Sequence, residues 1–258
     1  MTRRLALLPL AWLLCAASVP PPADLDARAG FDQHLGTQLP LQTSLRNAED
    51  RAASLGDRLH GHPAIMALGY FECRHLCDTV MQSMAHAVAR AGLQPGRDVE
   101  VIFLSIDPRE GTDAAARARE RVGRSDPRTS AGQWQFLRAT PGALQAIARP
   151  LGFRYFRDAR LGEYIHPSGL VVITPDGRIA QYLFGVEYQP QALRLAVVDA
   201  SRGTLGSWTD RLVLLCCGYD PSTGRYSLLI GKLMRVLGVA FAALLLTVTA
   251  WSLRRHRA

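Results

Sequence analysis

A long apolar run that leads directly into a pair of cysteines limits the folds open to this chain. Residues Pro63–Phe71 have the length of a strand and carry no charged side chain, which is typical of a strand covered on both faces. Cys73 and Cys77 follow, and residues 80–88 then carry apolar side chains every four positions, as the buried face of a helix does. The sequence therefore predicts a buried strand that turns into a helix at the two cysteines.

Further strand-like and helix-like runs alternate along the chain. In order they are a buried strand at Val99–Ile106, an exposed helix at Gly111–Val122, a short strand at Trp134–Leu137, a helix at Pro141–Ala148, an extended piece at Phe153–Phe156, a hairpin around Pro175-Asp176-Gly177 and a closing helix at Pro190–Asp199. This alternation indicates an α/β three-layer sandwich. We expect it to span residues 61–205, after a polar N-terminal lead-in segment at 24–60.

The positive charge of the chain lies mainly at its two ends. The net charge is +8, with 30 basic and 22 acidic residues. Seven of the basic residues fall in segments 1–23 and 228–258, which contain no acid, so the body carries 23 basic against 22 acidic residues. A nearly neutral body gives no support for nucleic-acid binding, and we expect no nucleic-acid partner.

Residues 1–18 have the order of a secretory signal peptide. Two arginines precede the apolar stretch Leu5–Ala17, and small residues stand at Ala16–Ser18. The stretch is short for a membrane span, which needs about 20 residues. Cys15 offers lipid attachment as an alternative, but the bulky leucines before it disfavour that reaction, so we expect cleavage near the small residues.

The C-terminal part has the features of a membrane anchor. Residues 228–253 are mostly apolar and long enough for a transmembrane helix of about 20 residues. The basic tail 254–258 should stay in the cytoplasm. Together with the signal peptide, it predicts a single-pass protein of the inner (cytoplasmic) membrane. The domain and the membrane-proximal segment 206–227 would face the periplasm or another extracytoplasmic space. The alternative for residues 228–253 is a buried core helix.

Cys73 and Cys77 are four residues apart, so both sulfur atoms can face the same side of a helical turn. A helix N-terminus favours the thiolate form. Two converging thiolates can bind copper(I) or act as a redox pair, and both chemistries remain open. His166 precedes the hairpin and is the best candidate for a third ligand, because an adjacent strand would bring it to the cysteine end. A solvated or structural histidine is the alternative.

Several motifs follow one another across residues 31–226. They are Phe31-Asp32-Gln33, the run Tyr70–Cys77, Ser105–Glu110, Trp134–Leu137, Tyr164–Gly169, Leu215-Cys216 and Tyr219–Tyr226. In this order they resemble the Sco/SenC family. The resemblance implies a thioredoxin-like fold, membrane attachment outside the cytoplasm, and delivery of a copper ion to the dinuclear copper centre of cytochrome c oxidase.

By position, the resemblance places the copper ligands at Cys73, Cys77 and His166 and an acidic residue near the metal at Asp107. As a hydrogen-bond acceptor, Asp107 would orient His166 or the cysteine loop. The alternative is that Asp107 is a helix N-cap or turn residue before Pro108.

The sequence also departs from the family. Arg74 stands where the family usually has Pro, and its charge should lower the thiol pKa values. His75 stands where related members often have Met, and it is a solvent-facing residue, an extra ligand or a proton carrier. Many members are tethered at the N-terminus instead. Cys216 and Cys217 are interpreted as buried thiols, with a membrane-proximal metal relay as the alternative.

Two functions are consistent with these residues. The first is a membrane-tethered metallochaperone that passes copper by ligand exchange to the copper-bearing subunit of cytochrome c oxidase or to another copper protein, without catalytic turnover. The second is a thiol-disulfide oxidoreductase that reduces the cysteines of an oxidase subunit or another extracytoplasmic partner. The fold would be the same in both, although such oxidoreductases usually carry Cys-x-x-Cys. A peroxide-reducing enzyme and a purely structural disulfide are the remaining alternatives.

Overall fold

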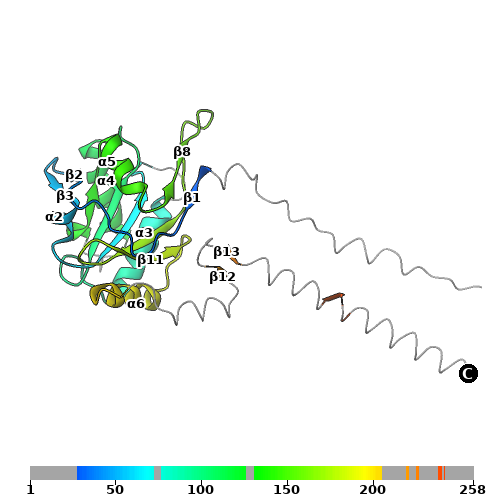
Figure 1. Cartoon of the computed structure of the whole chain (residues 1–258). Helices are drawn as coiled ribbons and strands as arrows, with labels where there is room; N and C mark the ends of the chain where they lie inside the picture. The colour runs from blue at the N-terminus through cyan, green and yellow to red at the C-terminus, as the bar shows by residue number, and fades with distance from the viewer. Residues whose placement is uncertain are drawn as a thin grey trace, which may run out of the picture.

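The computed structural model describes residues 28–72, 77–125 and 131–204, with short pieces at 219–220, 225–226, 238–239 and 241. A five-stranded sheet forms its centre, with strand order β11-β10-β4-β5-β6 (Figure 1). The strands are β4 (Ala64–Gly69), β5 (Glu100–Ser105), β6 (Gln135–Leu137), β10 (Gly169–Ile173) and β11 (Ile179–Phe184). The first three are parallel, β10 is antiparallel to β4, and β11 is antiparallel to β10.

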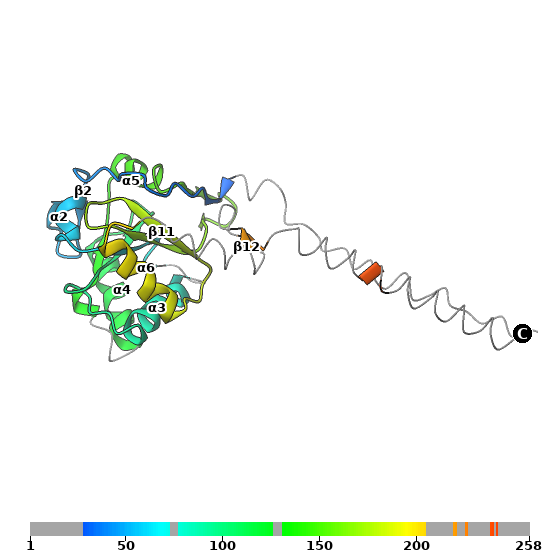
Figure 2. The same cartoon turned by 60° about the horizontal axis from the view of Figure 1, so that its bottom comes forward.

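Helices cover both faces of the sheet (Figures 1 and 2). One face carries α3 (Cys77–Arg90), α4 (Thr112–Ser125) and α6 (Pro190–Ser201), whose apolar residues share one core with the sheet. The other face carries α2 (Leu55–Leu59) and α5 (Pro141–Ala148) over a second core. The predicted three-layer sandwich is confirmed. Every residue of β4 and β5 is buried, as the apolar sequence of β4 and the apolar centre of β5 predict for strands between two layers.

The helix α5 begins where the sequence predicts. Thr140 is its N-cap, and the Thr140 hydroxyl accepts a hydrogen bond from the backbone N–H of Ala143 at 3.3 Å. Pro141 occupies the first turn, where its missing N–H costs no helical hydrogen bond.

The helix α4 differs from the exposed helix expected at Gly111–Val122. It buries a stripe of small residues against the sheet, namely Ala114, Ala115, Ala118 and Val122. The arginines of α4 lie on its other sides, and because alanine is only weakly apolar, their number hides the buried stripe in the sequence.

The predicted hairpin around Pro175-Asp176-Gly177 is confirmed by the pairing of β10 with β11. Gly177 closes the turn with a φ of 83°, a value that residues other than glycine rarely adopt. A Cβ atom on Gly177 would lie 2.4 Å from Cδ2 of Leu41. This glycine is therefore required both by its backbone conformation and by the packing of the lead-in segment against the turn.

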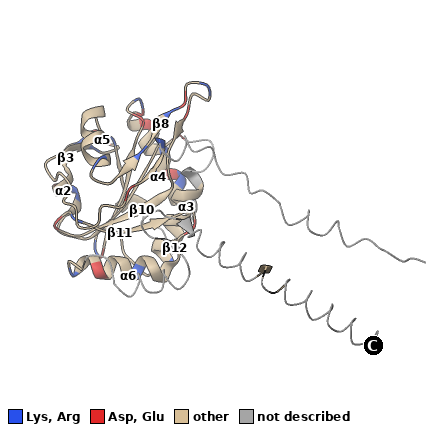
Figure 3. Cartoon of the chain, turned by 45° about the vertical axis from the view of Figure 1, so that its right-hand side comes forward, with Lys and Arg blue, Asp and Glu red and all other residues tan. Residues whose placement is uncertain are grey.

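Short strands and one 3₁₀ turn complete the described elements. β2 (Ser44–Arg46) pairs with β3 (Ala52–Ser54), and the turn η1 (Ala131–Gln133) precedes β6. The other pairs are β1 (Gly30–Phe31) with β7 (Phe153–Arg154), β8 (Phe156–Arg157) with β9 (Tyr164–Ile165), and β12 (Tyr219–Asp220) with β13 (Arg225–Tyr226). In Figure 3, basic and acidic residues are interspersed over the described elements.

The expected membrane segments fall largely outside the described residues. These are the signal peptide at 1–18, the membrane-proximal cysteines Cys216 and Cys217, and most of the anchor at 228–253. Within the described ranges, no helix combines the length and the apolar composition that a membrane crossing requires.

Candidate metal centre

The segment that carries the cysteines begins at the carboxyl end of β4. Tyr70 and Phe71 follow the strand and are buried, whereas Glu72 is exposed. Residues 73–76, which include Cys73, Arg74 and His75, lie outside the described part of the chain. The helix α3 begins at Cys77, and the side chain of Cys77 is also outside the described part of the chain. In sequence, the thiol pair therefore lies between the end of β4 and the first residue of α3.

His166 lies beside the start of this segment. The strand β10 runs antiparallel to β4 with Leu170 opposite Ala67, so the residues that precede β10 lie next to those that follow β4. The imidazole ring centroid of His166 is 5.9 Å from that of Tyr70, in an edge-on arrangement at 75°. Tyr70 is three residues before Cys73. The topology therefore brings the predicted third ligand to the cysteine end of the sheet.

One ring nitrogen of His166 is engaged by the backbone. Its Nδ1 lies 2.9 Å from the carbonyl oxygen of Pro167. A carbonyl can only accept a hydrogen bond, so in the neutral ring Nδ1 carries the proton and Nε2 the lone pair. A metal would then bind at Nε2, while the backbone contact fixes the ring orientation.

An aromatic cluster surrounds the imidazole. Besides Tyr70, the ring of Phe153 lies 6.1 Å from that of His166. Tyr164 extends the cluster, with its ring 5.9 Å from Tyr70 and 6.0 Å from Tyr155. Burial raises the pKa values of Tyr155 and Tyr164 above their usual range, so both phenols are neutral at physiological pH. The cluster restricts the movement of His166 without adding charge next to it.

Asp107 forms a turn at the end of β5. Its carboxylate accepts a hydrogen bond from the backbone N–H of Arg109 at 3.0 Å and is bridged by the Arg109 guanidinium at 2.5 and 2.8 Å. Burial alone would raise the pKa of Asp107, but the hydrogen bonds and charge of Arg109 hold it below its usual range. The described contacts are those of a turn residue. A role in orienting His166 or the cysteine loop stays a prediction.

An open cavity of about 680 Å³ adjoins the start of the cysteine segment. Its lining includes Tyr70, Glu72, Asp107, Glu110 and Tyr164. It separates the β5–α4 connection from the β8–β9 hairpin, so a partner could reach this edge of the sheet. Glu110 belongs to a motif used for the family resemblance, but sequence reasoning assigned it no role, because its partners are backbone groups far away in sequence.

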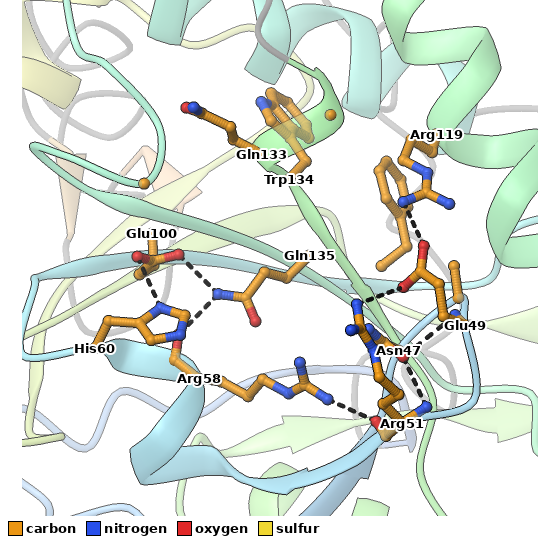
Figure 4. A pocket seen from close by; sticks show the side chains of 14 residues that line it. Asn47, Glu49, Arg51, Arg58, His60, Glu100, Arg119, Gln133, Trp134 and Gln135 are labelled. Carbon is orange, nitrogen blue, oxygen red and sulfur yellow. Dashed lines mark hydrogen bonds and ion pairs between the residues drawn. The ribbon is translucent and has the colours of Figure 1, made fainter.

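A second polar cavity, of about 540 Å³, lies at the opposite end of the same strands (Figure 4). Here the buried carboxylate of Glu100 is 3.1 Å from Nδ1 of His60, 3.3 Å from Nδ1 of His62 and 2.7 Å from Nε2 of Gln135. These contacts fasten the α2–β4 turn to β5 and β6. Among the described side chains, no group of three His, Cys, Asp or Glu residues could hold a metal ion.

The fold, together with the cysteines that follow β4, which we call the cysteine edge, defines a class of protein. It is a thioredoxin-like α/β domain with a thiol pair between a central strand and a helix. The chain matches the SCO1/SenC family over residues 44–199, which is more than half of its length. It belongs to that family. No curated protein matches the chain.

Solved structures share this fold. A candidate electron transfer protein of Aquifex aeolicus VF5 is 26% identical, with a TM-score of 0.59 over 66% of this chain and 95% of its own. ScoI of Arabidopsis thaliana with copper bound is 19% identical, with a TM-score of 0.51 over 65% of this chain and 98% of its own. BsSco, a Sco-family cytochrome c oxidase assembly protein with a disulfide switch, is 18% identical, with a TM-score of 0.50 over 67% and 97%.

Proposed function

We propose that this chain is a membrane-anchored copper metallochaperone that binds copper through Cys73, Cys77 and His166. The observation that carries the proposal is the position of His166, whose ring lies against Tyr70 three residues before the first cysteine. Copper as the cargo is supported by membership of the SCO1/SenC family, which includes proteins solved with copper bound. The proposed recipient is the dinuclear copper centre of cytochrome c oxidase, because BsSco is a member of the Sco family of cytochrome c oxidase assembly proteins.

The proposed ligand set suits copper(I). Two thiolates and one imidazole give a soft, three-coordinate site, and a site with few ligands can be entered by a partner's thiolate. Copper would then leave by stepwise replacement of the ligands, with no electron transfer and no turnover. The Pro167 carbonyl and the Tyr70 ring contact the imidazole and would hold it in place for the metal.

The membrane attachment belongs to the same proposal. The signal peptide at 1–18 and the anchor at 228–253 would hold the domain on the extracytoplasmic face of the inner membrane. An oxidase subunit in that membrane would then meet the cysteine edge without three-dimensional diffusion.

A second candidate function is thiol-disulfide exchange with an oxidase subunit or another extracytoplasmic partner. It is favoured by the position of Cys77 at the start of α3, where the helix dipole stabilises a thiolate. In that reaction the thiolate of one cysteine attacks a partner disulfide, and the second cysteine resolves the mixed disulfide, so the partner is reduced and this chain oxidised. His166 would not be needed.

A copper(I) competition titration of the reduced full-length chain tests the proposal. We expect one copper per chain and a loss of affinity of at least tenfold in the His166→Ala variant, as removal of one of three ligands implies. His86→Ala is the matched control, because His86 is exposed on α3. Unchanged affinity in His166→Ala would count against the three-ligand site and leave thiol-disulfide exchange as the function.

A further inference from the structure

The carboxylate of Glu110 binds the backbone that leads into Cys73. One oxygen accepts the N–H of Phe71 at 2.8 Å, and the other accepts the N–H of Glu72 at 2.7 Å. The hydroxyl of Ser105, at the end of β5, donates to the same carboxylate at 2.5 Å. Two consecutive peptide groups are therefore held by one side chain from the β5–α4 connection, and the next residue in the chain is Cys73.

Other contacts hold the same short segment. The guanidinium of Arg121 donates to the carbonyl oxygen of Phe71, and that of Arg117 binds the carboxylate of Glu72. Both arginines come from α4. The segment is thus fixed through its N–H groups, a carbonyl and a side chain before the thiol pair begins.

The arrangement of Glu110 has an energetic cost. Burial raises the pKa of this carboxyl above its usual range, although the hydrogen bonds from Ser105, Phe71 and Glu72 lower it. Removing a carboxylate from water costs free energy, and water or a hydroxyl could also accept hydrogen bonds from these two N–H groups. What the carboxylate adds is geometric, because its two charge-assisted hydrogen bonds to adjacent amides fix the direction of the backbone.

The segment Tyr70–Glu72 connects two of the proposed ligands. Its first ring contacts His166 at 5.9 Å, and its last residue precedes Cys73. Between these points lie the two amides that Glu110 holds. We propose that Glu110 is a positioning residue that fixes Cys73 relative to His166 and so presets the spacing of the copper ligands. This inference rests on the proposed function, but its effect on Cys73 does not require copper.

The test compares Glu110→Gln with two controls in the full-length chain, after Cys15, Cys216 and Cys217 have been replaced by Ser. Glu120→Gln changes an exposed carboxylate on α4. Glu100→Gln disturbs a buried carboxylate at the opposite end of β5, and it controls for a general loss of stability. Two quantities are measured in each variant, the copper(I) affinity and the rate at which Cys73 is alkylated in the reduced, copper-free chain.

We expect Glu110→Gln to lower copper(I) affinity about tenfold, as the loss of a supporting hydrogen-bond acceptor commonly does, and to change the alkylation rate of Cys73 severalfold. Both controls should stay within about twofold of the parent chain. The inference is overturned if Glu110→Gln matches the parent in both measurements, or if Glu100→Gln lowers affinity equally. If the parent binds no copper, the proposed function fails, and the alkylation rates alone decide whether Glu110 positions Cys73.

Discussion

The ring of Tyr70 lies edge-on to the imidazole of His166, with centroids 5.9 Å apart and planes at 75°. This contact joins the end of β4 to the residues that precede β10. It exists because the two strands are antiparallel neighbours, so a histidine far from the cysteines in sequence meets the segment that carries them.

Loss of the Tyr70 ring should disturb the candidate metal centre more than loss of its hydroxyl. Tyr70→Ala removes a buried ring and should cost about 3 kcal/mol of unfolding free energy, together with a severalfold loss of copper(I) affinity. Tyr70→Phe keeps the ring contact with His166 and should retain affinity within about twofold. Denaturant unfolding and a copper(I) competition titration measure the two effects. Equal affinity in both variants would show that the ring does not hold the imidazole.

Gly177 should be intolerant of a side chain. Its φ is 83°, and a Cβ atom would lie 2.4 Å from the Leu41 side chain. Gly177→Ala should therefore lower the free energy of unfolding by about 1–3 kcal/mol. Gly142→Ala is the matched control, because Gly142 lies in α5 with open space around its Cβ position, and it should be neutral or slightly stabilising. A similar response of the two variants to denaturant would disprove the account of this turn.

The Glu100 cluster should contribute to stability but not to metal binding. Glu100 is 2% exposed and binds His60, His62 and Gln135. Glu100→Ala should cost about 2 kcal/mol, because three polar groups lose their shared acceptor. Glu120→Ala, on the exposed side of α4, should change the unfolding free energy by less than about 0.5 kcal/mol. Copper(I) affinity should be the same in both variants.

Asp107 should make stability depend on pH below about pH 4. Arg109 holds the pKa of Asp107 below its usual value, so the unfolded chain binds this proton more readily than the folded one. The stabilisation is therefore present above the unfolded pKa and is lost as the pH falls through the folded pKa. The difference in unfolding free energy between the parent and Asp107→Asn should be constant from about pH 5 to pH 7 and shrink below about pH 4. A difference that grows on acidification would contradict the Asp107–Arg109 pairing.

The sequence was sufficient for the elements whose signals are local. The apolar runs in β4 and β5 predict buried strands, Pro141 predicts the start of α5, and Pro175-Asp176-Gly177 predicts the hairpin. Each of these patterns is read within a few residues, and each depends on burial or on turn conformation. The order of the elements was then enough to indicate three layers.

Other features depend on contacts between distant residues. The buried face of α4 consists of three alanines and Val122, and the weak hydrophobicity of the alanines is outweighed by the arginines around them. Glu110 binds the N–H groups of Phe71 and Glu72, and backbone amides carry no sequence signal. The Glu100 cluster likewise joins His60, in the turn between α2 and β4, to Gln135 on β6, so only the folded structure reveals it.

X-ray absorption spectroscopy of the copper(I)-loaded full-length chain tests the central claim most directly, because it identifies the atoms bound to the metal. We predict two sulfur ligands and one imidazole nitrogen in the parent chain, and loss of the nitrogen in His166→Ala with both sulfurs retained. A parent spectrum without an imidazole, or an unchanged nitrogen in His166→Ala, would contradict a site built from Cys73, Cys77 and His166.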